Sequence, residues 1–167
     1  MRLVEQTVPS ADPDPKALAC YGLLVQERTA QGVSQEHVWL RFATARPVSA
    51  LTVEFLTWVC PKLTAAGKTA LLLVWDNASW HRSHAVRHWL REHNRRVKRE
   101  RQGIRIVSCP LPIKSPWLNP LEVHWVHGKR AVVEPGRLLT AAELIERVHT
   151  HFGCAHEELL TIPQQVS

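Results

Sequence analysis

The sequence predicts a single α/β domain with a mixed sheet, and three observations lead to this fold class. Hydrophobic residues make up 45% and charged residues 22% of the 167 residues, which is typical of a globular chain long enough to bury a core. Short apolar runs alternate with longer segments whose apolar residues recur at helical spacing. The run Leu71–Val74 is apolar throughout, as in a strand that is covered on both faces.

The first elements expected along the chain are a loop and a hairpin. Residues 9–15 contain three prolines, which remove backbone donors and prevent a helix. Residues 17–25 and 38–43 are expected to form two strands. The polar segment between them, which contains Gly32, is expected to be a hairpin-like connection.

A helix is expected after the hairpin, with Ser49 as its N-cap. Pro61 should kink or shorten its last turn, and Gly67 should end the segment. Its apolar positions repeat at helical spacing and are Leu51, Phe55, Leu56, Val59 and Leu63.

The second half predicts a strand over 71–74, a helix capped by Ser83, a short strand over 104–107 and a proline-rich loop over 110–120. The helix after Ser83 has one apolar face, made of Val86, Trp89, Leu90, His93 and Val97.

Two further helices complete the predicted domain. Asn119 is the expected N-cap of the first, with Pro120 at its first position. The last helix starts at Thr140, with Glu143 three residues on as a capping box, and Gly153 ends it. It is expected to bury Leu144, Ile145, Val148 and Phe152.

The formal net charge of +6 favours polyanionic partners, nucleic acid first. Basic residues concentrate between positions 82 and 105, where only Glu92 and Glu100 oppose them. Arg87, Arg91 and Arg95 recur every four residues and therefore share one helix face. This pattern favours a footprint on a phosphate backbone over an ordinary solvated face. The basic residues are Arg82, Arg87, Arg91, Arg95, Arg96, Lys98, Arg99, Arg101 and Arg105.

Composition also excludes some classes of protein. The longest apolar run, Ala70–Trp75, is far shorter than the roughly 20 residues of a membrane-spanning helix. The N-terminus has no apolar stretch of signal-peptide length, so we expect a cytoplasmic protein without a membrane partner. The cysteines, at 20, 60, 109 and 154, are widely spaced, which argues against a disulfide scaffold.

Asp76 is the first candidate for chemistry. It follows the buried strand at its carboxyl end, where α/β sheets bind ligands, and a carboxylate there can hold a divalent cation. An Asp or Asn at this position also commonly starts a turn, so both roles stay open for Asp76 and Asn77.

Glu122 is the second candidate. As the third residue of the predicted helix, it can reach back to the amide of the N-cap residue. The same first turn can instead aim the carboxylate into a metal site, with Trp125 packed beneath it. Spacing does not choose between these two roles.

A cluster of zinc-type ligands lies near the C-terminus, at His149, His151, Cys154 and His156. Because His149 and His151 are two residues apart on a helix, they point to different faces. This favours surface histidines and a buried cysteine over a zinc site.

Two motifs together resemble the mariner-like insertion-sequence transposases, which are DDE superfamily endonucleases. They are Trp75-Asp-Asn-Ala-Ser-Trp-His81 and Leu111-Pro-Ile-Lys-Ser-Pro-Trp-Leu-Asn-Pro-Leu-Glu122, in this order and with a helix between them. The stretch from Val126 to Glu134 is also similar to this family.

The resemblance implies an RNase H-like fold, Mg²⁺ or Mn²⁺ as cofactor, and cutting and joining of transposon ends, typically into a TA target. By motif match, Asp76 and Glu122 correspond to the second and third catalytic, metal-binding carboxylates. Two metal ions can activate the attacking oxygen and stabilise the leaving one. Asn77, His81, Asn119 and Trp125 would support the site. Lys114, Lys129 and Arg130 would join the basic helix in binding terminal repeats and target DNA.

The family's first catalytic Asp lies on the first, central strand, upstream of the region that matches residues 3–8. Asp12 and Asp14 lie in the proline loop and are poor substitutes. We therefore expect an RNase H-like sheet that lacks its first strand. In this partial catalytic domain, residues 1–16 are a lead-in, 17–162 the core and 163–167 a tail.

Three functional hypotheses follow from the sequence. The first is a fragment of a bacterial-type transposase that cleaves DNA near the nucleoid, with the missing N-terminal part needed for activity. The second is a non-catalytic remnant that binds DNA or inhibits a full-length transposase by pairing with it, or that forms a homodimer. The third is a decayed reading frame without a stable product, against which cooperative unfolding would count.

Overall fold

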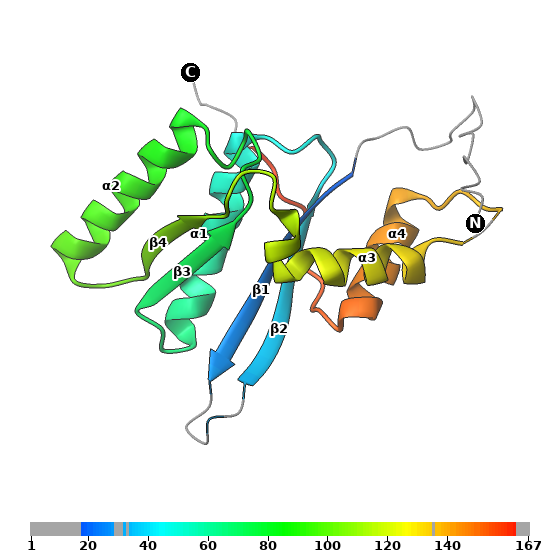
Figure 1. The fold of residues 1–167 in the computed structure, drawn as a ribbon, viewed down its shortest axis with the longest axis horizontal. Coiled ribbons are helices and arrows are strands. Elements are labelled where there is room, and N and C mark those ends of the chain that lie inside the picture. Colours follow the sequence, from blue (N-terminus) through cyan, green and yellow to red (C-terminus); the bar gives the residue numbers. More distant parts are fainter. Residues whose placement is uncertain (1–17, 29–31, 33, 135, 163–167) are drawn as a thin grey trace.

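A computed structural model describes residues 18–162 apart from 29–31, 33 and 135 (Figure 1). The expected lead-in, the tail, Asp12 and Asp14 therefore lie outside the described residues, and the division of the domain stays a prediction. The described part is a mixed α/β arrangement of four α-helices and two small sheets, consistent with a partial RNase H-like fold. No helix in this part is long and apolar enough to cross a membrane.

The first sheet is the expected hairpin. Strand β1 (Ala19–Arg28) pairs antiparallel with β2 (Ser34–Ala43), from the pair Ala19 and Ala43 to the pair Arg28 and Ser34. Both strands extend further toward the turn than their apolar runs predict. The reason is that backbone pairing continues through polar residues such as Gln26 and Glu36, whose side chains share a 2.6 Å hydrogen bond.

The second sheet is a β-α-β unit. Strands β3 (Ala70–Trp75) and β4 (Arg105–Pro110) are parallel, and helix α2 (His84–Glu100) connects them. Ser83 caps α2 as expected, accepting a 3.2 Å hydrogen bond from the Val86 amide.

The expectation of a single mixed sheet is wrong for the described residues, because β1 and β3 do not pair. The two strands line opposite sides of a groove of about 900 Å³, which we call the inter-sheet groove. Figure 1 shows β1 and β3 as the inner strands and β2 and β4 as the outer ones.

Helix α1 (Ser49–Ala65) packs against both sheets and carries the main core. The N-cap is Val48 rather than the expected Ser49, and no side chain of the helix caps it. Instead the Tyr21 hydroxyl of β1 accepts a 3.2 Å hydrogen bond from the Val48 amide. Tertiary contact thus replaces local capping at this helix end.

Pro61 does not end α1, which continues to Ala65. The fully or largely buried side chains of Val59, Cys60 and Leu63 on either side of Pro61 hold this turn against the core. Gly67 follows the helix in the left-handed region, with φ +71°, as expected for a stop signal.

A second core lies on the other face of the hairpin, where Leu40 and Phe42 of β2 meet Val132 and Val148. These two valines belong to helices α3 (Pro120–Val132) and α4 (Ala141–Phe152). Of the residues that α4 was expected to bury, only Val148 is buried, while Leu144, Ile145 and Phe152 are half-buried.

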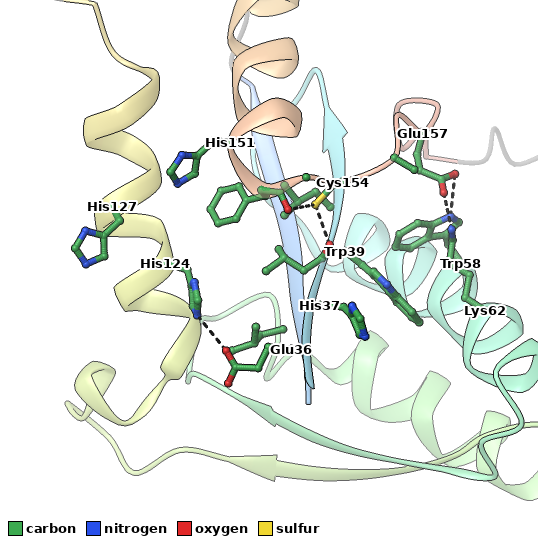
Figure 2. Close-up of a pocket in the computed structure, with 16 residues that line it drawn as sticks. Glu36, His37, Trp39, Trp58, Lys62, His124, His127, His151, Cys154 and Glu157 are labelled. Carbon is green, nitrogen blue, oxygen red and sulfur yellow. Dashed lines mark hydrogen bonds and ion pairs between the residues drawn. The ribbon is translucent and has the colours of Figure 1, made fainter. Parts of the chain in front are cut away.

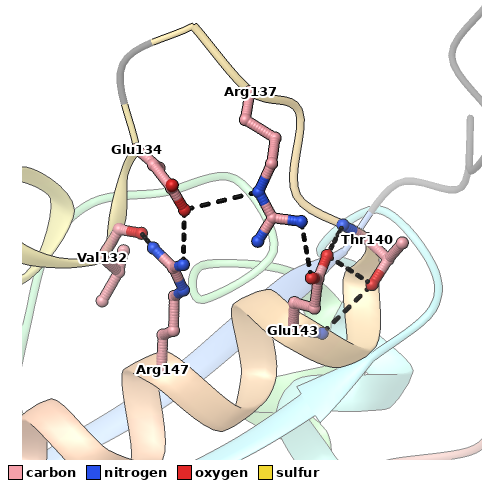
Figure 3. Close-up of polar contacts among 6 residues, drawn as sticks. All are labelled: Val132, Glu134, Arg137, Thr140, Glu143 and Arg147. Carbon is pink, nitrogen blue, oxygen red and sulfur yellow. Dashed lines mark hydrogen bonds and ion pairs between the residues drawn. The ribbon is translucent and has the colours of Figure 1, made fainter.

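Ion pairs fix the connection between α3 and α4 (Figure 3). Arg147 binds the Val132 carbonyl at 3.2 Å and Glu134 at 2.6 Å, and Arg137 bridges Glu134 and Glu143. The Thr140 amide donates a 2.9 Å hydrogen bond to Glu143, which completes the expected capping box. These bonds hold the pKa of Glu143 down at about 2.

The core also buries two histidines. His93 is bound, with Nε2 2.7 Å from the Ile104 carbonyl oxygen. His149 is 2% exposed, and its Nδ1 has no hydrogen-bond partner among the described residues. Burial lowers the pKa of His149, and the stacked ring of His156, 4.4 Å away between centroids, contributes. The expectation that His149 is a surface histidine is therefore wrong.

Acid should destabilise the fold through His149. The unfolded chain binds a proton at this residue below a pH of about 6.5, whereas the folded chain resists it, so stability falls as the pH drops through that value. His149→Gln should flatten the dependence of the unfolding free energy on pH between about 7 and 5, by up to roughly 1.4 kcal/mol per pH unit. Denaturant titrations at several pH values measure the unfolding free energy of both proteins. The same pH dependence of the unfolding free energy in His149→Gln and in the unaltered chain would contradict this prediction.

Candidate functional site

Asp76 and Glu122 both line the inter-sheet groove. Asp76 follows the last residue of β3, and Glu122 belongs to the first turn of α3. The groove therefore collects one carboxylate from the carboxyl end of a strand and one from the start of a helix.

Asp76 is held by two donors that both use Oδ1. The Ala78 amide lies 2.9 Å from this oxygen, and His81 Nδ1 lies 2.9 Å from it. The His81 ring stacks on Trp75, with 4.9 Å between centroids and 14° between planes. Because no described residue bonds Oδ2, this oxygen remains available to a ligand. The expected turn role and a ligand role are thus compatible in one side chain.

Asn77 connects two loops of the chain. Its amide donates a hydrogen bond to the Leu111 carbonyl, which belongs to the loop after β4. Asn77 therefore ties the end of β3 to the segment that leads toward α3, rather than contacting Asp76. The same segment contains the exposed Lys114, whose backbone is in the left-handed region with φ +60°.

Glu122 does not cap its own helix. Asn119 caps α3 as expected, accepting a 3.2 Å hydrogen bond from the Leu121 amide. The half-buried Glu122 side chain has no hydrogen bond or ion pair to any described residue. Glu143, at the same third position of α4, is fully engaged in its capping box. Unlike Glu143, Glu122 therefore does not serve as a capping residue of its helix.

The ring of Trp125 packs between Phe152 of α4 and Gly22 of β1. Its ring meets Phe152 edge-on, with 5.5 Å between centroids. A Cβ at Gly22 of β1 would lie only 2.7 Å from Trp125 Cζ2, so the strand needs glycine at this position. Trp125 thus fixes the first two turns of α3 against β1, on the side of the groove that Glu122 shares.

The predicted basic residues of α2 are exposed, including Arg82 just before the helix. Arg95 pairs with Glu92 at 2.6 Å and Arg99 with Glu100 at 3.1 Å, whereas no acid pairs with Arg87 or Arg91 in the described part. Lys129 and Arg130 are also exposed, in the last turn of α3. The remaining members of the predicted basic set are exposed too, namely Arg96, Lys98, Arg101 and Arg105.

The zinc-type residues do not converge. Cys154 donates its thiol proton to the Val38 carbonyl at 2.8 Å, and burial raises the pKa of this thiol, so it is protonated. His151 meets Phe152 edge-on, and His156 pairs with Glu146 at 3.3 Å. Among residues 18–162 with the stated gaps, no three His, Cys, Asp or Glu side chains could hold a metal ion together.

A separate pocket of about 560 Å³ contains several histidines (Figure 2). His37, His124, His127 and His151 line it from three different elements. Of these histidines, His124 lies near an acid, with Nε2 3.9 Å from Glu36, and an ion pair of 2.5 Å between Lys62 and Glu157 also lies in the pocket lining. The spacing of these histidines in the sequence does not predict this pocket, because they come together only through the packing of α3 and α4 on β2.

Comparison with known proteins gives one match. The family model described as DDE superfamily endonuclease matches residues 35–145, which include Asp76, Glu122 and all of α2. No curated protein and no solved structure matches the chain. The matched segment covers more than half of the sequence. The chain therefore belongs to the DDE superfamily endonucleases.

Proposed function

We propose that this chain forms part of the catalytic domain of a mariner-like insertion-sequence transposase, which cleaves DNA and joins transposon ends with the help of Mg²⁺ or Mn²⁺. The family implies divalent metal use and DNA binding. The observation that carries the proposal is the pair Asp76 and Glu122, which line one groove and keep carboxylate oxygens free of any bond within the described residues.

The donor set fits a hard divalent cation. Carboxylate oxygens are the ligands that Mg²⁺ and Mn²⁺ prefer, and Asp76 and Glu122 would hold the ion. A bound ion supplies positive charge that stabilises the attacking and leaving oxygens of phosphodiester transfer. Two carboxylates are fewer than such sites use, so full activity requires a third carboxylate from outside the described residues.

The remaining side chains of the site position these carboxylates. His81 and the Ala78 amide fix Asp76 through Oδ1, which leaves Oδ2 as the ligand atom. Asn119 caps α3 and so orders the backbone of the first turn, which carries Glu122. A ligand whose orientation is already fixed loses less freedom on metal binding, and such supporting contacts commonly raise metal affinity about 10- to 100-fold.

The exposed basic face of α2 is the proposed contact for the DNA backbone. The helix starts close after His81, so DNA lying along it passes near the strand end that carries Asp76. Arg87 and Arg91 pair with no acid among the described residues, so within this part of the chain they can neutralise phosphates without first breaking an ion pair. Arg82, Arg95, Arg96, Lys98, Arg99, Lys114, Lys129 and Arg130 extend the proposed contact.

The alternative is a non-catalytic remnant that binds DNA or pairs with a full-length transposase. It is favoured by the lack of a third metal-binding side chain among the described residues. Both functions use the exposed basic face of α2 to bind DNA. Only the transposase function also includes metal binding and DNA cleavage.

Metal binding tests the carboxylate pair. Asp76→Asn and Glu122→Gln should each weaken Mn²⁺ binding to the chain by tenfold or more, because each removes a charged ligand. His81→Gln should weaken it within the range of about 10- to 100-fold, because Asp76 loses its fixed orientation. Electron paramagnetic resonance of free Mn²⁺ measures the affinity.

Glu143→Gln is the matched control, because Glu143 occupies the same helix position as Glu122 but is used for capping. This variant should bind Mn²⁺ like the unaltered chain. Equal binding by all four variants would exclude Asp76 and Glu122 as ligands.

DNA binding tests the face of α2. Changing Arg87, Arg91 and Arg95 together to Gln should lower affinity for duplex DNA and reduce the salt dependence of log K by about 2.7, at roughly 0.9 per lost phosphate contact. Changing the same three residues to Lys keeps the charge and should preserve most of the affinity. Fluorescence anisotropy at several salt concentrations measures both. An unchanged salt slope in the Gln variant would place the DNA elsewhere.

Nicking of supercoiled plasmid DNA separates the enzyme from the remnant. Because the described residues lack a third carboxylate for the site, the transposase proposal expects only weak nicking by this chain, which needs Mg²⁺ or Mn²⁺ and is lost in both Asp76→Asn and Glu122→Gln. Nicking that is equal in the unaltered chain and both variants would come from a contaminant and would contradict it. Salt-sensitive DNA binding with no nicking would favour the remnant.

A further inference from the structure

Trp117 differs from every other tryptophan of the chain. All seven tryptophans lie in the described part, and the other six are half-buried, each in contact with another aromatic or imidazole ring. Trp117 is instead 73% exposed, and its ring contacts no ring of a described residue. Tryptophan is usually a largely buried side chain because of its large apolar area. Such an exposed ring is typical of a residue that contacts a ligand or partner.

The backbone around Trp117 holds the ring at a defined place. Trp117 belongs to the 3-10 helix η1 (Pro116–Leu118), and Asn119 follows directly as the cap of α3. At the other end of the loop, the Leu111 amide donates a 2.8 Å hydrogen bond to the Trp75 carbonyl at the end of β3. Because both ends of this loop are fixed, binding through the Trp117 ring requires little further ordering of the chain.

The loop that carries Trp117 lies at the end of the second sheet where Asp76 lies. Strands β3 and β4 are parallel and therefore end on the same side, where α2 also starts (Figure 1). Glu122 follows Trp117 by five residues, in the first turn of α3. The exposed ring thus belongs to the segment that connects the strand ends with one of the two candidate carboxylates.

The charge of this segment favours an anionic ligand. The sequence contains no Asp or Glu between Glu100 and Glu122, and Lys114 is exposed three residues before Trp117. An aromatic ring next to a cation matches the chemistry of a nucleotide, because a base can stack on the ring while a phosphate binds the cation. Inside a duplex both faces of a base are already stacked, so the ring requires a base that has left the stack or stands at its end.

We propose that Trp117 stacks on an unpaired base at a DNA end and that Lys114 binds a neighbouring phosphate. This inference rests on the proposed function, since cutting and joining of DNA brings DNA ends to Asp76 and Glu122. Every base has a flat π-face, so this site recognises that a base is unpaired and does not select among the four bases. Trp117 is thereby a DNA-binding residue and has no part in holding the metal ion.

The probe is a fluorescein-labelled DNA duplex with a short single-stranded overhang, made in a 3′ and a 5′ version. Two matched DNAs are the controls. One has a blunt end, and the other has an overhang of abasic sites, which keeps the phosphates and removes the bases. Fluorescence anisotropy measures the affinity of the full chain without metal ions, so that the DNA stays uncut. The unaltered chain should bind the overhang of at least one polarity at least fivefold more tightly than the abasic overhang.

Trp117→Ala should weaken binding of the overhang DNA about 5- to 150-fold and leave binding of the blunt duplex unchanged. Trp117→Phe keeps an aromatic ring and should retain most of the affinity. Ile113→Ala is the matched control, because Ile113 is 69% exposed in the same loop but has no ring to stack. It should bind like the unaltered chain. Both side chains are exposed, so neither substitution removes a core contact.

A fluorescent base gives a second readout of stacking. The emission of 2-aminopurine at the first unpaired position should fall when the unaltered chain binds, because stacking quenches it, and should fall much less with Trp117→Ala. Lys114→Asn keeps a residue type that tolerates the left-handed backbone, where Lys114 has φ +60°. This variant should reduce the salt dependence of log K for the overhang DNA by about 0.7, the value for one phosphate contact on a single strand.

Three results would overturn the proposal. They are equal affinity of the unaltered chain for the overhang and the abasic overhang, equal affinity of Trp117→Ala and the unaltered chain for the overhang, and an equal loss in Ile113→Ala and Trp117→Ala. The last result would identify a general apolar surface suited to a protein partner. Failure of the proposed function is recognised separately, by equal Mn²⁺ binding in the carboxylate variants and by an unchanged salt slope for duplex DNA in the α2 variant.

Discussion

The packing of α1 against both sheets is the constraint on which the rest of the structure depends. The described strands form two pairs without a hydrogen bond between them, and α1 provides the shared apolar surface. Its start is fixed by the Tyr21 hydroxyl of β1, and its buried side chains contact Leu73 of β3 within the same core. Helix α1 therefore sets the separation of β1 and β3, and with it the width of the groove that Asp76 and Glu122 line.

Glu122 and Glu143 show how the surroundings decide what the same residue type does at the same position of a helix. Glu143 and Glu122 stand at the third position of their helices, yet only Glu143 bonds back to its N-cap. At α3 the Asn119 side chain caps the helix, and Pro120 removes one of the backbone donors that needs a partner. The helix end is satisfied without Glu122, which frees this carboxylate to face the groove.

Much of the fold could be predicted from the sequence, because it depends on local signals. The caps at Ser83, Asn119 and Thr140, the stops at Gly67 and Gly153, and the existence of every described α-helix and strand follow from periodicity and capping chemistry. The short 3-10 helix Pro116–Leu118 lies in the segment that was expected to be a loop. The predictions that were wrong depend on contacts between residues that are far apart in the sequence. Tyr21 replaces Ser49 at a helix start, and packing around Pro61 outweighs its missing donor.

For the candidate site, two motifs select Asp76 and Glu122, and the segment that matches the family model includes both residues. Their role as metal ligands stays a prediction. The bonds from Asn77 to Leu111 and from His81 to Asp76 depend on loop paths that spacing does not encode. The burial of His149 was not predictable either, since it results from the docking of α4 on Phe42.

The pairing of each strand with the next strand along the chain has a consequence for how the molecule folds. Hairpin formation between β1 and β2 and closure of the β3-α2-β4 unit both join segments that are close in sequence. The hairpin needs only a short connection, whereas the parallel β3–β4 pair has to enclose all of α2, and parallel pairing is intrinsically the slower kind. We therefore expect the β1–β2 hairpin to form before the β3–β4 pair during folding.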